Sequence, residues 1–154
     1  MHSDPQLRTW RAFLRAHSRV TDLLEAELQA EKGLSLSWYD VLVQLEEAEG
    51  HRLRMTGLAA NVLLSKSGLT RLVDRMCEAG LVSREADEDD RRGRWVCLTG
   101  AGEERLRDAA VTHLRGIRRH FTSLLTAEAA ATMAAALEAV AESAERVLKD
   151  GGRA

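Results

Sequence analysis

The sequence has little proline and little cysteine, and each shortage excludes a class of protein. One proline among 154 residues, with 45% hydrophobic and 30% charged residues, excludes collagen-like chains and disordered low-complexity chains. The two cysteines, Cys77 and Cys97, are too few and too far apart for a disulfide framework or a CxxC metal knuckle. No apolar run approaches the roughly 18 residues of a membrane span, and the N-terminus lacks the apolar stretch of a signal peptide. We therefore expect one cytoplasmic domain, with or without appended helices, that has no membrane association and no cofactor.

The charges nearly balance, with 22 basic and 24 acidic residues and a net charge of −2. This balance argues against unselective coating of nucleic acid, so any DNA binding must come from a local patch. Residues 51–98 are a candidate, because their nine basic and seven acidic residues give +2 while the rest of the chain carries −4. Nineteen of the 22 basic residues are arginine, which binds phosphate and guanine in a bidentate way. A GC-rich genome produces the same excess of arginine.

Hydrophobic periodicity predicts a mainly helical fold with one small β-hairpin. Ser3 or Asp4 caps a long first helix, with Pro5 in its first turn, and the apolar face of this helix is broader than a small domain covers. Ser37 is expected to open the second helix through a capping box, and Thr56 is expected to cap the third. The expected helices span 4–33, 37–49, 56–62, 65–79, 99–124 and 126–148, and the expected strands span 81–86 and 94–98.

The helix expected over 65–79 has a polar face that suits a DNA groove. Small and hydroxylated residues come first and arginine follows one turn later, so hydroxyls and N-terminal amides meet phosphates while arginine reaches base edges. An ordinary amphipathic helix with a solvated face explains the same pattern about equally well. The polar face consists of Lys66, Ser67, Gly68, Thr70, Arg71, Asp74 and Arg75.

The neighbouring elements favour DNA binding. A short helix, a tight turn and a second helix form the helix-turn-helix arrangement, in which the second helix enters the major groove. The hairpin that follows carries Arg91 and Arg92 at its tip and Arg94 on its returning strand, where they are placed to reach a minor groove. The alternative is a solvated turn in which the acidic residues 87–90 pair with these arginines.

These motifs, in this order, resemble the MarR family of bacterial transcription regulators. The resemblance rests on the segments 56–59, 64–76, 80–82, 90–92 and 96–99, and the flanking helices extend it over nearly the whole chain. It implies a mainly α fold with a small β-hairpin wing, that is, a winged helix-turn-helix with dimerisation helices at both ends. The implied parts are an N-terminal dimerisation helix (1–34), a DNA-binding region (35–99), C-terminal dimerisation helices (100–150) and a frayed tail (151–154).

The resemblance also implies a function. Such a protein binds a pseudo-palindromic operator in double-stranded DNA as a homodimer, acts as a repressor and is released by a small ligand. Asp90 is expected to hold Arg92 in the minor groove, while the stretch from Gly93 to Trp95 departs from the family pattern. The resemblance implies DNA contacts by Thr56, Ser65, Ser67, Thr70, Arg71 and Arg92. The polar helix face and the hairpin add Lys66, Arg75, Arg91 and Arg94 to the predicted DNA-binding residues.

Members of this family often bind a small anionic aromatic effector between the first, second and fifth helices. Arg15 suits the carboxylate of such a ligand. Core aromatic residues and a surface arginine explain the same residues, and this plainer interpretation is slightly favoured. The candidate lining residues are Trp10, Arg15, His17, Trp38 and Tyr39.

No metal site or catalytic site is predicted. His113 and His120 share a helix face but lie about 10.5 Å apart along its axis, too far to bind one zinc ion without His17 from another helix. Core positions are favoured for Cys77 and Cys97. No nucleophile with an adjacent base and no phosphate-binding loop stands out, so an enzyme is not expected.

The alternative function is a dimeric protein-interaction module with a degenerate winged helix. The acidic residues 87–90 of the hairpin are its best support. The two functions differ in salt dependence, because DNA binding has a log–log slope of about −0.9 for each phosphate contact.

Overall fold

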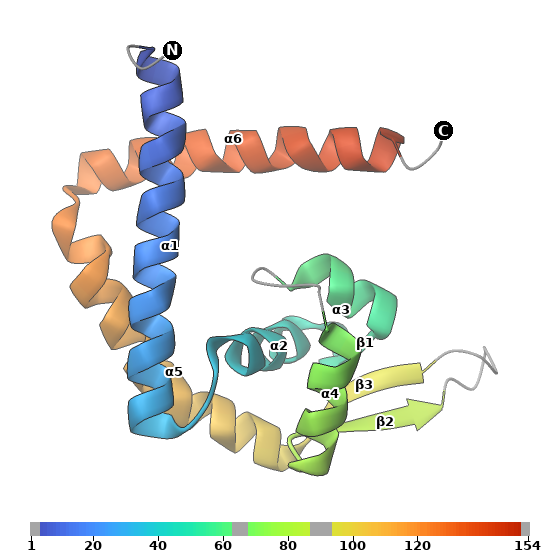
Figure 1. Cartoon of the computed structure of the whole chain (residues 1–154). Coiled ribbons are helices and arrows are strands. Elements are labelled where there is room, and N and C mark those ends of the chain that lie inside the picture. The colour runs from blue at the N-terminus through green and yellow to red at the C-terminus, as the bar shows by residue number, and fades with distance from the viewer. Residues whose placement is uncertain (1–3, 63–67, 87–93, 152–154) are drawn as a thin grey trace. The chain divides into compact units, whose positions relative to one another are not determined.

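A computed structural model describes residues 4–62, 68–86 and 94–151 of the chain. The chain divides into two compact units, Met1–Gly116 and Ile117–Ala154. The mainly helical fold and the antiparallel pair of strands predicted from periodicity are confirmed (Figure 1). The elements are α1 (Pro5–Lys32), α2 (Leu36–Glu47), η1 (Glu49–His51), β1 (Arg52–Arg54), α3 (Met55–Asn61), α4 (Leu69–Glu78), β2 (Val82–Ala86), β3 (Arg94–Leu98), α5 (Gly100–His120), η2 (Thr122–Leu124) and α6 (Ala127–Gly151).

Helix α1 begins and ends where the sequence predicts. The Asp4 carboxylate accepts a hydrogen bond from the Gln6 backbone N–H at 2.9 Å, and Pro5 follows in the first turn. Gly33 ends the helix in the left-handed region at φ 58°, where its N–H donates to the Gln29 carbonyl. Glycine adopts this φ without steric cost. Local chemistry therefore sets both ends of this 28-residue helix.

Helix α2 starts before its predicted cap. Its cap is Ser35 rather than Ser37, and Ser35 Oγ accepts a hydrogen bond from the Trp38 N–H at 3.2 Å. The earlier start brings Leu36 into the helix, where its side chain is only 5% exposed. The Leu36 N–H donates to the Glu25 carboxylate of α1 at 2.6 Å. Burial of Leu36 and this contact with α1 are tertiary interactions, which the local capping pattern does not contain.

The sheet has a third strand, β1, that periodicity did not predict. The strand order is β1-β3-β2, both pairs are antiparallel, and Leu53 lies opposite Val96. Three residues are too few for an alternating pattern to stand out, so pairing with β3 is what makes this segment a strand. Strand β1 leads directly into α3, which starts at Met55. The expected cap, Thr56, therefore lies inside the first turn of α3 and does not cap it.

The core of the first unit is built from side chains of α1, α2, α3, α4, α5 and the sheet. Helix α4 buries Leu69, Val73 and Met76 and half-buries Leu72, and these apolar residues lie opposite its predicted polar face. The opposite face of α4 consequently points outward. The largest side chains that are fully buried include Leu28, Leu34, Leu42, Leu45, Leu58 and Val96.

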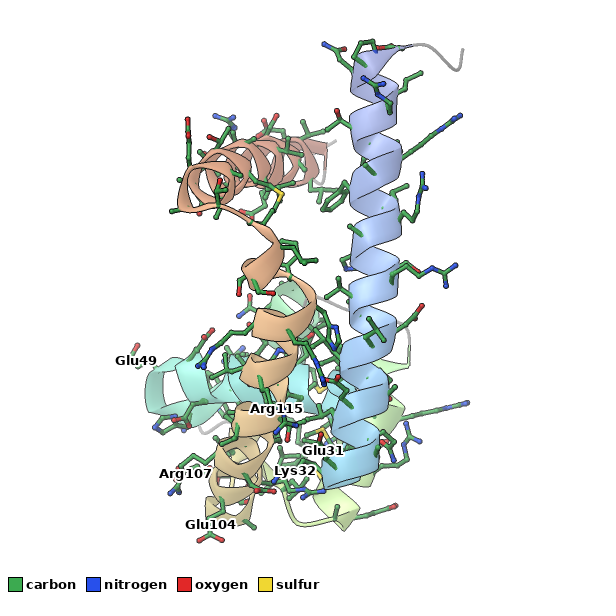
Figure 2. The ribbon with its side chains drawn as sticks, turned by 90° about the vertical axis from the view of Figure 1, so that its left-hand side faces the viewer. Glu31, Lys32, Glu49, Glu104, Arg107 and Arg115 are labelled. Atoms are coloured by element: carbon green, nitrogen blue, oxygen red, sulfur yellow. The ribbon has the colours of Figure 1, made fainter. Side chains whose placement is uncertain are left out.

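Polar contacts fix the C-terminal half of α1 to α5 (Figure 2). Lys32 Nζ lies 2.5 Å from Asp108 Oδ1, and Arg115 binds the Glu31 carboxylate at 2.5 Å. The hydrogen bond from Arg115 holds the pKa of Glu31 below its ordinary value, and a second hydrogen bond from Thr112 acts in the same direction. These side chains are partly exposed, so the pairs contribute more to orientation than to stability.

Each unit exposes large apolar side chains on a helix. In the first unit, Leu7, Trp10, Phe13 and Leu14 on α1 have exposed fractions of 40–55%. In the second unit, the exposed residues of α6 include Val140, Val147 and Leu148. Apolar patches of this kind mark contact surfaces. Across the residues that the structure describes, no single helix is long and apolar enough to cross a membrane. The bent helix pair Gly100–Leu124 and Ala127–Leu148 has the length and composition of a membrane span only when the two helices are taken together.

Candidate nucleic-acid interface

Helices α3 and α4 bring three of the predicted DNA-binding residues together. Thr56, Thr70 and Arg71 line one open groove between these helices, and all three are exposed. Gly68 precedes α4 at φ 74° and leaves the start of the groove without a side chain. The groove therefore combines hydroxyl groups, a guanidinium group and a helix end with little bulk.

The N-terminal half of the outer face of α4 carries positive charge. Of the two acidic residues on this face, Asp74 binds Arg84 of β2, with Oδ1 and Nη2 2.8 Å apart, and Glu78 is the last residue of the helix. Arg71 and Arg75 are exposed and have no ion pair among the described residues. Two guanidinium groups one turn apart thus face solvent beside the α3–α4 groove.

Several predicted site residues lie outside the described residues. They are the helix residues Ser65, Lys66 and Ser67 and the hairpin residues Asp90, Arg91 and Arg92. Arg94 is described and is exposed at the first position of β3. The structure therefore places the strands of the predicted wing and one of its three arginines.

Two further arginines lie on β1, beside the returning strand β3 of the hairpin, and the sequence analysis did not predict them as site residues. The guanidinium carbons of Arg52 and Arg54 lie 4.7 and 5.3 Å from the ring centre of Trp95, within the range of cation–π attraction. Arg54 is paired directly with Trp95, and Arg52 with Cys97, so all share one face of the sheet. The Arg-Leu-Arg alternation of β1 was the available signal, but it spans only three residues.

Comparison with known proteins agrees with this geometry. A sequence model described as MarR family matches residues 32–93. The crystal structure of AbsC, a MarR family transcriptional regulator from Streptomyces coelicolor, is 39% identical, with a TM-score of 0.84 over 94% of this chain and 97% of AbsC. The chain belongs to the MarR family. Its winged-helix relatives confirm the predicted fold class, and they are transcription regulators rather than enzymes.

Two other MarR family relatives are informative. Sco3205 from Streptomyces coelicolor, solved in complex with DNA, is 34% identical, with a TM-score of 0.83 over 93% of this chain and 89% of Sco3205. The transcriptional repressor YetL of Bacillus subtilis is 34% identical over 88 residues, which are 57% of this chain and 53% of YetL. The chain spans about half the length of the first curated relatives that it matches.

A pocket of about 200 Å³ opens between α1, α2 and α5, where a MarR family effector was expected. The rings of Tyr39 and His113 contact each other in it, with their centres 4.3 Å apart and their planes tilted by 41°. His113 Nδ1 is buried without a hydrogen-bond partner among the described residues, and burial lowers the pKa of this histidine. The other described lining residues are Thr21, Leu24, Leu36, Asp40, Val43 and Gln44.

Only Tyr39 of the five predicted effector residues lines this pocket. Trp10, Arg15 and His17 are exposed on α1, and Trp38 is half-buried on α2. His113, which the sequence analysis considered as a metal ligand, is a lining residue that it did not predict. The signal was a histidine on the inward face of its helix, which core packing explains equally well.

The two cysteines occupy ordinary packing positions. Cys97 is buried in β3 and Cys77 is half-buried in α4. Burial raises the pKa of the Cys97 thiol, and the neighbouring Glu85 raises it further. A thiol that stays protonated is a poor nucleophile, so Cys97 suits a packing role.

Proposed function

We propose that this MarR family chain is a cytoplasmic transcriptional repressor that binds double-stranded DNA as a homodimer. The observation that carries the proposal is the α3–α4 groove, which places Thr56, Thr70 and Arg71 together on an exposed positive face. Two relatives support the same function. Sco3205 was solved in complex with DNA, and YetL is a transcriptional repressor.

In the proposed complex, α4 enters the major groove with its N-terminal end first. Arg71 contacts a guanine edge, Thr70 and Thr56 contact phosphate oxygens, and Arg75 binds the backbone one turn later. Arg91, Arg92 and Arg94 of the wing reach the minor groove, with Asp90 orienting Arg92. Ser65, Lys66 and Ser67 complete the contacts at the start of the helix.

The proposed dimer covers the exposed apolar residues of the terminal helices. Trp10 and Phe13 on α1 are 55% and 40% exposed, and Leu148 on α6 is 74% exposed. Burying such residues against a second chain removes apolar surface from water, which is the main driving force of association. The dimer presents its two α4 helices to half-sites that lie about 10–10.5 bp apart.

The pocket between α1, α2 and α5 is proposed as the effector site. Its described lining contains Asp40 and a histidine that burial keeps neutral, but no lysine or arginine. A carboxylate ligand would need a cation in this lining, so an uncharged aromatic ligand fits better than the anionic one first expected. Tyr39 and His113 offer ring faces for stacking, and the unpartnered His113 Nδ1 offers a hydrogen bond.

The neutral state of His113 predicts a pH dependence of stability. Burial lowers its pKa from the ordinary value of 6.5, so the unfolded chain binds a proton there before the folded chain does. The contribution of neutral His113 to the free energy of unfolding is therefore complete above pH 6.5 and is lost as the pH falls through the pKa of the folded state. We expect wild type to lose stability relative to His113→Gln as the pH is lowered from 7.5 to 5.5. Urea denaturation measures the difference, and His17→Gln, on the exposed face of α1, is the control. If the difference in unfolding free energy between wild type and His113→Gln does not change with pH, His113 is not buried in its neutral form.

Fluorescence anisotropy tests the proposed function. DNA from upstream of this protein's own gene is titrated over a series of salt concentrations, with scrambled DNA as the control. We expect tight, sequence-selective binding with a steep salt slope, of about −0.9 for each phosphate contact. Equal, weak binding to both DNAs would overturn the proposal and favour a protein partner instead. Analytical ultracentrifugation of the same sample checks for the dimer.

A further inference from the structure

Glu46, His51 and Glu103 come together although Glu103 is far from the other two along the chain. One ring nitrogen of His51 and one carboxylate oxygen from each glutamate lie within 4.8 Å of one another. The three residues belong to the end of α2, the η1 turn and the first turn of α5. Sequence spacing does not predict this cluster, because the fold brings the start of α5 beside the end of α2.

The backbone orients the imidazole of His51. Its Nδ1 lies 2.9 Å from the Glu46 carbonyl oxygen. A carbonyl oxygen only accepts hydrogen bonds, so Nδ1 is the donor in this contact, and the same nitrogen lies 3.5 Å from Glu46 Oε2. Histidines that bind metal ions nearly always donate their second nitrogen in this way. With Nδ1 held by the backbone, Nε2 is the nitrogen through which His51 would bind an ion.

The cluster is open to solvent and carries excess negative charge. The side chains of His51 and Glu46 are 51% and 46% exposed, which leaves a path for an ion to enter. Glu103 forms a long ion pair with Arg107, in which Oε2 and Nη2 are 3.9 Å apart. Two carboxylates this close repel each other, and a bound cation removes that repulsion.

We infer that Glu46, His51 and Glu103 bind a divalent transition-metal ion of the Zn²⁺ type. Imidazole suits zinc and its neighbours in the first transition row, whereas Mg²⁺ prefers oxygen ligands and retains its waters. Three protein ligands leave a further position for water. A bound ion ties the end of α2 and the η1 turn to the first turn of α5. This site does not depend on the proposed DNA-binding function.

Isothermal titration calorimetry of the metal-free, tag-free chain with ZnCl₂ tests the inference. We expect one Zn²⁺ per chain at this site and no binding of Mg²⁺ at the same concentration. Glu103→Gln and Glu46→Gln each remove one ligand and are expected to weaken Zn²⁺ binding by about tenfold or more. Equal affinity for Mg²⁺ would overturn the assignment to a transition metal.

The chain offers a matched control for each variant. Glu104→Gln and Glu47→Gln make the same change of charge one residue away, on exposed side chains outside the cluster (Figure 2 labels Glu104). We expect both controls to bind Zn²⁺ like wild type. His51→Asn provides a third test, because asparagine tolerates the positive φ of 51° at this position. The inference is overturned if wild type does not bind Zn²⁺, or if the ligand variants, shown to be folded by circular dichroism, bind it as their controls do.

Discussion

Gly102→Ala is expected to destabilise the folded chain by about 3 kcal/mol, at the upper end of what overpacking a tight site costs. A methyl group at Gly102 would lie 2.2 Å from the Leu81 carbonyl oxygen and 2.7 Å from Leu98 Cδ1. The Leu81 carbonyl does not move away easily, because it accepts hydrogen bonds from the N–H and the hydroxyl of Thr99. The new side chain therefore pushes the start of α5 away from the sheet. Urea denaturation followed by circular dichroism measures the loss.

Gly100→Ala is the matched control for this substitution. It makes the same change two residues earlier in the same helix, where a methyl group meets nothing within 4 Å. We expect it to leave stability unchanged or to raise it slightly, since alanine forms helix more readily than glycine. Equal effects of the two substitutions would show that helix propensity, and not contact with Leu81, governs this turn.

Arg71→Ala is expected to weaken binding to the operator by about 1–3 kcal/mol, or roughly 5- to 150-fold, and to relax the base preference at one position. Arg71 is exposed beside Thr56 and Thr70 in the α3–α4 groove and has no ion pair among the described residues. Its guanidinium group is therefore available to bind a guanine edge through two hydrogen bonds. Anisotropy titrations against the operator and its single-base variants measure both effects.

Two other arginine substitutions separate base reading from charge. Arg107→Ala removes the same charge from an exposed position of α5, outside the α3–α4 groove, and is expected to leave affinity and base preference unchanged. Arg92→Ala, at a position outside the described residues, is expected to weaken every sequence alike. If Arg71→Ala binds the operator with wild-type affinity, α4 does not dock as proposed.

Elements whose signals lie within a few residues were predictable. Asp4 and Gly33 set the ends of α1 because a cap and a left-handed glycine act on the adjacent backbone. The inward stripe of α4 follows from helical spacing, and its burial at Val73 and Met76 turns the opposite face outward. Ser37 failed as a cap because burial of Leu36, together with its hydrogen bond to Glu25, favours an earlier start.

The candidate DNA-binding face was predictable to the same degree, and its surroundings were not. Thr70 and Arg71 follow from the periodicity of one helix, so their exposure needs no knowledge of the rest of the fold. Arg52 and Arg54 join this region only because β1 pairs with β3 and brings them over Trp95. A segment of three residues is too short for its sequence pattern to predict that pairing.

Local sequence was therefore sufficient for the helices, the hairpin strands and the polar face of α4, since each depends on neighbours within about one turn or one strand pair. Contacts between segments far apart in the chain defined the rest. The pocket pairs Tyr39 of α2 with His113 of α5, and the proposed metal site joins Glu103 of α5 to the end of α2. Such pairs depend on how whole helices pack, and packing is the sum of many weak contacts that no single segment encodes.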